Sequence, residues 1–141
     1  MSTFDEYQKQ SRIANQAHAN NKEEVMHWAI GLGEEAGEVL SVVKHKYYGG
    51  QYSVEDMIEE LGDVLWYVAT MCTACGLSLD DVADYNIAKL LHRYPDMEFD
   101  EQRSKTRHQL AGDFRQSEAR NEIMSRVLTK ARVIEKSKLE V

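Results

Sequence analysis

The chain has 141 residues, of which 43% are hydrophobic and 29% charged, and its formal net charge is −7. This length is enough to bury a real core, and the composition excludes a disordered chain. An acidic chain lacks the basic surface of a nucleic-acid-binding protein and the attraction to anionic membranes, so we expect neither partner. An anionic ligand would need cations to mediate its contact with this chain.

The first residues contain no apolar core of a signal peptide, and no segment is long and apolar enough to span a bilayer. We therefore expect a cytoplasmic protein, or a protein of the host cytoplasm if the gene is viral. Cys72 and Cys75 form a C-x-x-C pair without a surrounding βαβ pattern, and two thiols cannot complete a tetrahedral zinc site. We interpret them as two buried helical thiols rather than a redox motif.

Helical periodicity dominates the sequence, and capping residues divide it into helices. The segment Thr3-Phe4-Asp5-Glu6 is typical of a capping box and predicts a first helix that ends near Asn20. Asn21 is the predicted cap of a second helix, which runs to about Tyr48 and ends at Gly49-Gly50.

Ser53 is the predicted cap of a third helix, which continues to about Cys75 and stops at Gly76. Ser78 caps a fourth predicted helix. This helix ends before Pro95, because a proline disfavours helical geometry in the residue before it.

The character of the chain changes after the fourth helix. Residues 96–113 are polar and predict a loop, whereas residues 114–138 predict a fifth, amphipathic helix. We therefore predict an all-α fold, a compact bundle of about four core helices plus a C-terminal helix. Residues 1–99 form the predicted functional domain, and residues 100–141 form a polar loop and a helix that is an oligomer arm, a packing element or disordered.

Two short motifs place five carboxylates on the second and third helices. The acidic residues of GEEAGEV and of EELGDVL are three and four residues apart, so each set projects from one side of its helix. The five residues are Glu34, Glu35, Glu38, Glu60 and Asp63. Taken alone, glutamates at these spacings usually mark a solvated helix face.

The surroundings of the second motif favour a metal site. The third helix is apolar on almost every side between Met57 and Cys72, a pattern typical of a buried helix. A buried, unpaired carboxylate is costly unless it is protonated or meets a cation, and no lysine or arginine lies within a turn of Glu60 or Asp63. Oxygen ligands favour Mg²⁺, with Mn²⁺ as a substitute, so we predict a magnesium site.

Four glycines lie inside these two predicted helices, although each costs about 1 kcal/mol relative to alanine in a helix. They are Gly31, Gly33, Gly37 and Gly62. We interpret them as points where two helices, or a ligand and the backbone, approach closely beside the carboxylates, with tight packing without function as the alternative.

The fourth helix carries a polar face of opposite charge. Asn86, Lys89 and Arg93 are three and four residues apart and therefore share a face. Alone, this pattern is typical of a solvated surface helix. Beside a carboxylate–metal cluster, the same face would suit the oxygens of a phosphate group.

Three stretches of this sequence resemble the MazG-like all-α nucleoside triphosphate pyrophosphohydrolases: GLGEEAGEVLSVVKHKYYGG, EDMIEELGDVLWYVA and LSLDDVADYNIAKLLHRYPD. The resemblance covers about residues 4–99, and the E-E-x-x-E, E-x-x-D and N-x-x-K-x-x-x-R-Y-P motifs carry it. It implies a homodimer or homotetramer that hydrolyses a (deoxy)nucleoside triphosphate to the monophosphate and pyrophosphate. One departure follows Pro95, where DMEF stands in place of the x-G-F that such proteins often have.

The resemblance also implies the roles of individual residues. Mg²⁺ would be held by Glu35, Glu38, Glu60 and Asp63. Glu34 would bind a further ion or activate water, and either Glu34 or Glu35 would orient the water that attacks the α-phosphorus. Lys89 and Arg93 would contact the phosphates, with Asn86 nearby.

The preferred base and the reaction leave alternatives. Candidate substrates are dGTP, dCTP and dUTP, in a role in nucleotide-pool control. The first helix presents Ser11 and Asn15 as candidates for a base pocket, while Trp28 and Trp66 are better interpreted as core than as stacking residues. A non-catalytic nucleotide sensor and a metal-stabilised helical scaffold are the other classes of function, and pyrophosphate release distinguishes them from the enzyme.

Overall fold

The computed structural model describes residues 3–12, 20–51 and 53–139. The described residues form seven helices and no strand, which confirms the predicted all-α class. The helices fall into two compact units rather than one, the first ending at Cys75 and the second beginning at Gly76. Among the described residues no single helix is long and apolar enough to cross a membrane, and Val54–Ala74 and Leu79–Arg93 meet that criterion only when they are counted together as one bent pair.

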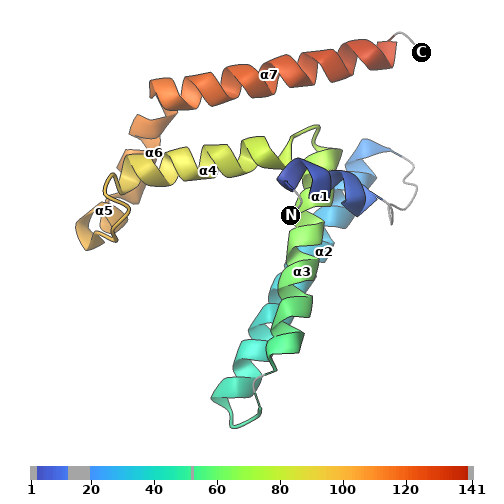
Figure 1. The fold of residues 1–141 in the computed structure, drawn as a ribbon, viewed down its shortest axis with the longest axis vertical. Coiled ribbons are helices and arrows are strands. Elements are labelled where there is room, and N and C mark those ends of the chain that lie inside the picture. Colours follow the sequence, from blue (N-terminus) through green and yellow to red (C-terminus); the bar gives the residue numbers. More distant parts are fainter. Residues whose placement is uncertain (1–2, 13–19, 52, 140–141) are drawn as a thin grey trace. The chain divides into compact units, whose positions relative to one another are not determined.

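The first unit consists of α1 (Phe4–Ser11), α2 (Asn21–Tyr47) and α3 (Val54–Ala74). Figure 1 shows α2 and α3 side by side as an antiparallel pair, and α1 packs against α3. The predicted ends of α2 and α3 are confirmed to within one residue. The first helix is shorter than predicted, and residues 13–19 lie outside the described part of the chain.

Side-chain caps fix where these helices begin. Thr3 and Glu6 form the predicted capping box, with Thr3 Oγ1 accepting from the Glu6 amide at 3.2 Å. Asn20, not Asn21, caps α2, and its side chain accepts from the amide of the residue at the third helical position. Ser53 caps α3 as predicted.

An aromatic cluster forms the core of the first unit. Trp28 is 1% exposed and lies edge-on against Trp66, with ring centroids 5.4 Å apart. The indole nitrogen of Trp66 donates to the Ser11 carbonyl at 3.1 Å, which attaches α1 to α3. These contacts support the interpretation of both tryptophans as core residues.

The glycines of this unit behave in two ways. A Cβ at Gly31 would collide with the ring of Tyr67, so glycine is required for α2 and α3 to approach here. A Cβ at Gly33, Gly37 or Gly62 would meet no atom within 4 Å. The predicted close approach of the two helices is therefore confirmed at Gly31 and wrong for the other three glycines among the described residues, whereas approach of a ligand to the backbone stays a prediction.

The prediction that α3 is buried on every side is wrong for its first half. Its buried residues, Ala69, Thr70, Cys72 and Ala74, all lie near the C-terminal end. Val54, Ile58 and Leu61 in the first half are more than half exposed. The two neighbouring helices, α1 and α2, cover only part of the surface of α3. Cys75, which was predicted to be a buried thiol, is exposed.

The second unit consists of α4 (Leu79–Arg93), α5 (Glu101–Lys105), α6 (Arg107–Arg115) and α7 (Glu118–Leu139). The loop predicted at residues 96–113 is therefore wrong for most of its length. Asp100 begins α5 by accepting the Arg103 amide at 2.7 Å. Phe114 is 2% exposed and packs edge-on against Tyr85 at 5.2 Å, which anchors α6 on α4.

A buried carboxylate attaches α7 to α4. Asp81 is 3% exposed, and its two oxygens accept from Arg126 Nε at 2.6 Å and from Lys130 Nζ at 2.8 Å. Arg126 also reaches Asp84 at 2.6 Å. Because removing one partner would leave a buried charge uncompensated, this network holds the C-terminal helix on its own unit. A role of this helix as an oligomer arm stays a prediction.

Candidate active site

The antiparallel pair of α2 and α3 brings three of the predicted carboxylates together. One oxygen each of Glu35, Glu60 and Asp63 lies within 4.8 Å of the other two. Glu35 and Glu60 are half-buried and Asp63 is exposed. We call these three residues the carboxylate cluster.

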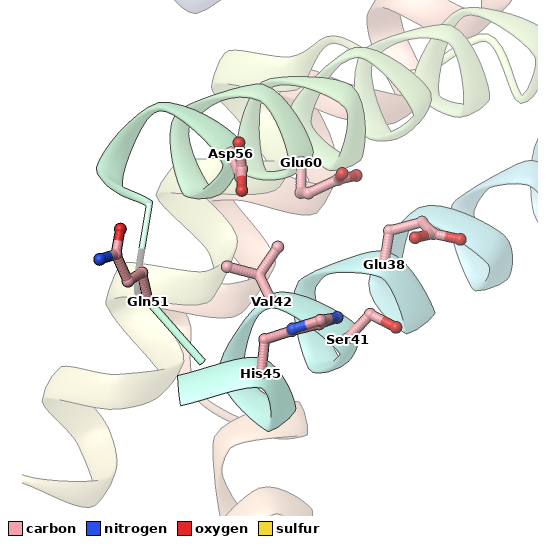
Figure 2. A pocket seen from close by; sticks show the side chains of 7 residues that line it. All are labelled: Glu38, Ser41, Val42, His45, Gln51, Asp56 and Glu60. Carbon is pink, nitrogen blue, oxygen red and sulfur yellow. The ribbon is translucent and has the colours of Figure 1, made fainter. Parts of the chain in front are cut away.

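The other two predicted carboxylates border this cluster. Glu38 lies one turn beyond Glu35 on α2 and lines a pocket together with Glu60 (Figure 2). Glu34 is exposed and precedes Glu35, and its charge is among those that raise the pKa of Glu35. Glu34 therefore lies next to the cluster without belonging to the group of three.

The cluster accumulates negative charge. Burial, and then the neighbouring Asp63 and Glu60, raise the pKa of Glu35 above its ordinary value. Burial, and then Glu38 and Asp63, do the same to the pKa of Glu60. None of the ion pairs among the described residues reaches these carboxylates.

This charge fits a divalent cation. A hard cation takes carboxylate oxygens as ligands, and its charge offsets both the burial and the mutual repulsion that raise the pKa values of Glu35 and Glu60. Three converging oxygens supply part of such a coordination shell, and water and a substrate phosphate complete it at typical magnesium sites. The donor set therefore fits a hard divalent ion, although the exposure of Asp63 removes the burial argument on which the sequence prediction relied.

Two tyrosines beside the cluster were missed from the sequence. Burial, followed by the charges of Glu35, Glu34 and Asp63, raises the pKa of Tyr67. Burial and the charge of Asp63 raise the pKa of Tyr7, which reaches the same region from α1. Tyr67 follows Asp63 by four residues and so shares its helix face, a spacing that could have identified it.

The predicted phosphate-binding residues lie in the second unit. Asn86 is exposed on α4, whereas Lys89 and Arg93 are half-buried. The Nε atom of Arg93 is buried and has no hydrogen-bond partner among the described residues. Their contact with the phosphates of a ligand at the carboxylate cluster stays a prediction.

The predicted base contacts of α1 are not tested by its geometry. Ser11 is buried, and its hydroxyl donates to the Gln8 carbonyl at 2.9 Å. Asn15 lies outside the described residues. Both remain predictions.

Fold and site together define an all-α protein with an acidic site suited to a divalent cation. The family model of the MazG nucleotide pyrophosphohydrolase domain matches residues 20–98, more than half of the chain. The chain therefore belongs to this family and is a nucleoside triphosphate pyrophosphohydrolase, as the resemblance implied. Comparison with curated proteins and comparison with solved structures each found no match.

Proposed function

We propose that this chain hydrolyses a (deoxy)nucleoside triphosphate to the monophosphate and pyrophosphate in a Mg²⁺-dependent reaction, in cytoplasmic control of the nucleotide pool. The observation that carries the proposal is the carboxylate cluster, whose three oxygens converge within 4.8 Å inside the matched family domain. Mg²⁺, or Mn²⁺ in its place, would be held by Glu35, Glu38, Glu60 and Asp63. Bound there, the ion would neutralise phosphate charge and lower the pKa of a water molecule.

The position of Glu34 suggests a different task from that of its neighbours. Glu35 is committed to the cluster by its position, whereas Glu34 borders the cluster and is exposed to water. An ionised carboxylate at this place can accept a hydrogen bond from the attacking water and orient it toward the α-phosphorus. We therefore assign Glu34 to water and Glu35 to the metal, with water orientation by Glu35 as the alternative.

The residues proposed to contact the phosphates are on α4. Lys89 and Arg93 would stabilise the negative charge that develops on the phosphates, with Asn86 as a neutral hydrogen-bonding partner. The buried Nε of Arg93, which has no hydrogen-bond partner within the described part of the chain, supports this role, because a guanidinium nitrogen without an acceptor is costly unless a ligand satisfies it.

The reaction can be tested on a panel of dATP, dCTP, dGTP, dUTP and dTTP, and the matching ribonucleotides, with Mg²⁺. We expect pyrophosphate and the monophosphate in equal amounts from at least one nucleotide, and no release in the presence of a chelator. Release of orthophosphate would contradict the proposed bond cleavage. Nucleotide binding without any release would favour a sensor, and metal binding alone would favour a scaffold.

We propose further that two copies of the chain pack through α2 and α3. Four apolar side chains of these helices are more than half exposed: Ile58 (66%) and Leu61 (52%) on α3, and Ile30 (67%) and Leu40 (69%) on α2. On α2, Gly33 and Gly37 lie between Ile30 and Leu40 at spacings of three and four, so all four residues share one face. A Cβ at either glycine would meet no atom within 4 Å. An apolar face with glycines permits close helix packing, and a second copy would supply the cover that this chain lacks.

The assembly can be tested by light scattering of the full chain. Ile58→Glu is expected to lower the measured mass to that of one chain of 16.2 kDa, because a charge would be buried in the interface. Leu128→Glu, at an exposed apolar position on α7, is the matched control and should leave the mass unchanged. A mass that falls only with Leu128→Glu would instead identify the C-terminal helix as the oligomer arm.

A further inference from the structure

A pocket of about 320 Å³ lies beside the carboxylate cluster, where α2 and α3 are joined (Figure 2). This volume is at the lower end of the range for small-molecule sites. Glu38, Ser41 and His45 line it from α2, and Asp56 and Glu60 line it from α3. Gln51 contributes from the connection, and Val42 adds one apolar surface.

The pocket continues the polar face of the carboxylate cluster along both helices. On α3, Asp56, Glu60 and Asp63 are spaced by four and three, so they share one face. Asp56 is seven residues from Asp63, which corresponds to about 10 Å along a helix. Because Glu60 belongs to both the cluster and the pocket, a ligand whose phosphates lie at the cluster can extend directly into the pocket.

The chemistry of the pocket favours a hydrogen-bond donor over a phosphate. Glu38 and Glu60 are assigned to the metal ion, so Asp56 is the one carboxylate of the pocket that the ion does not take. Asp56 forms no ion pair among the described residues, and its charge would repel a phosphate. An ionised carboxylate accepts hydrogen bonds and cannot donate them. Asp56 is among the side chains that line the pocket in Figure 2, where its carboxylate can accept from an amino group.

Local structure holds this end of the pocket in place. The Asp56 amide donates to Ser53 Oγ at 3.0 Å, which fixes Asp56 in the first turn of α3. The Gly50 amide donates to the His45 carbonyl at 2.8 Å, and a Cβ at Gly50 would stand 2.7 Å from that oxygen. Gly49 has a φ of +86°, which favours glycine. The turn that leads to Gln51, which lines the pocket, therefore favours glycine at both positions.

We propose that this pocket receives the base of the nucleotide and that Asp56 selects bases with an exocyclic amino group. Adenine, cytosine and guanine carry such a group, and uracil and thymine do not. The ring would lie against Val42, and the amide of Gln51 and the hydroxyl of Ser41 can pair with the remaining polar atoms of the base. This inference rests on the proposed function and adds the substrate class to it.

The test compares dCTP with dUTP, which differ in the group at position 4 of the ring. Wild type is expected to favour dCTP by about tenfold or more in kcat/KM, the effect of one hydrogen bond to a charged group. Asp56→Asn is expected to remove this preference through KM while kcat is retained, because an amide can donate to the keto oxygen of uracil. Asp56 is exposed, so the substitution should leave the fold intact.

Glu59→Gln is the matched control. Burial makes the largest contribution to the raised pKa of Glu60, and Glu59 and Asp56 both contribute as neighbouring charges. Glu59 does not line the pocket, so its substitution removes a similar charge without removing the proposed contact. We expect the dCTP preference to survive in Glu59→Gln, and its equal loss in both variants would overturn the proposal.

A second measurement needs no variant. The product dCMP is expected to inhibit the wild-type chain at lower concentration than dUMP does, and equal inhibition would overturn the inference. Failure of this inference is distinguishable from failure of the proposed function. Equal pyrophosphate release from dCTP and dUTP overturns only base selection, whereas no release from any nucleotide overturns the reaction itself.

Discussion

Replacing Glu60 with glutamine is expected to lower pyrophosphate release by at least about 100-fold while the helices stay folded. The amide keeps the shape of the side chain but removes an anionic ligand from the carboxylate cluster. Loss of an outer-shell partner at a metal site already costs about 10- to 100-fold, so loss of a direct ligand should reach the upper end of that range. Pyrophosphate release at saturating Mg²⁺ measures the effect, and far-ultraviolet circular dichroism checks the fold.

Glu59→Gln again serves as the control, since it removes a carboxylate one position earlier on the same helix. Glu59 is exposed and lies outside the cluster, so its turnover should stay close to wild type. Full activity of Glu60→Gln would mean that catalysis takes place elsewhere. An equal loss in both variants would point to the overall charge of α3 rather than to ligation.

The features that the sequence predicts correctly are local in the chain. Thr3 and Ser53 cap helices through hydrogen bonds to residues three positions away, so a short window of sequence contains the whole interaction. Helical spacing likewise determines which acidic residues share a face on α2 and on α3. The carboxylate cluster was therefore predictable once the two helices were expected to lie side by side.

The features that the sequence misses depend on distant parts of the chain. Asp81 is buried because Arg126 reaches it from 45 residues away, and no local pattern marks that pair. The polar residues before Phe114 concealed α5 and α6, and only α6 is anchored by that buried ring. The exposure of Ile58 shows that an apolar helix need not be covered by its own chain.

Mg²⁺ is expected to stabilise the folded chain against heat, and to do so more strongly at pH 7 than at pH 5. Metal binding requires deprotonated carboxylates, so protons compete with the ion at the lower pH. At a free ion concentration 100-fold above the dissociation constant, the stabilisation would be about 2.7 kcal/mol. Scanning calorimetry with Mg²⁺ and with a chelator measures the difference.

The metal-free chain should show the opposite dependence on pH at this site. Burial and neighbouring carboxylates raise the pKa of Glu35 and of Glu60 in the folded state. The folded state then binds more protons than the unfolded state, so the contribution of these groups to stability falls as pH rises through the raised pKa values. Other titratable groups of the chain also contribute to the pH dependence, so the total stability does not isolate the cluster.

The difference in stability between wild type and Glu60→Gln isolates the contribution of the carboxylate cluster. At a pH where Glu60 is protonated, the acid and the amide are nearly equivalent, and the two proteins should unfold at similar temperatures. Near pH 7 without metal, the variant should be the more stable, because it lacks one of the repelling charges. With Mg²⁺ the order should reverse, since the variant loses a ligand and gains little from the ion. A variant that is less stable than wild type without metal would contradict the repulsion among the carboxylates. A variant that Mg²⁺ stabilises as much as wild type would mean that the three carboxylates do not share a cation.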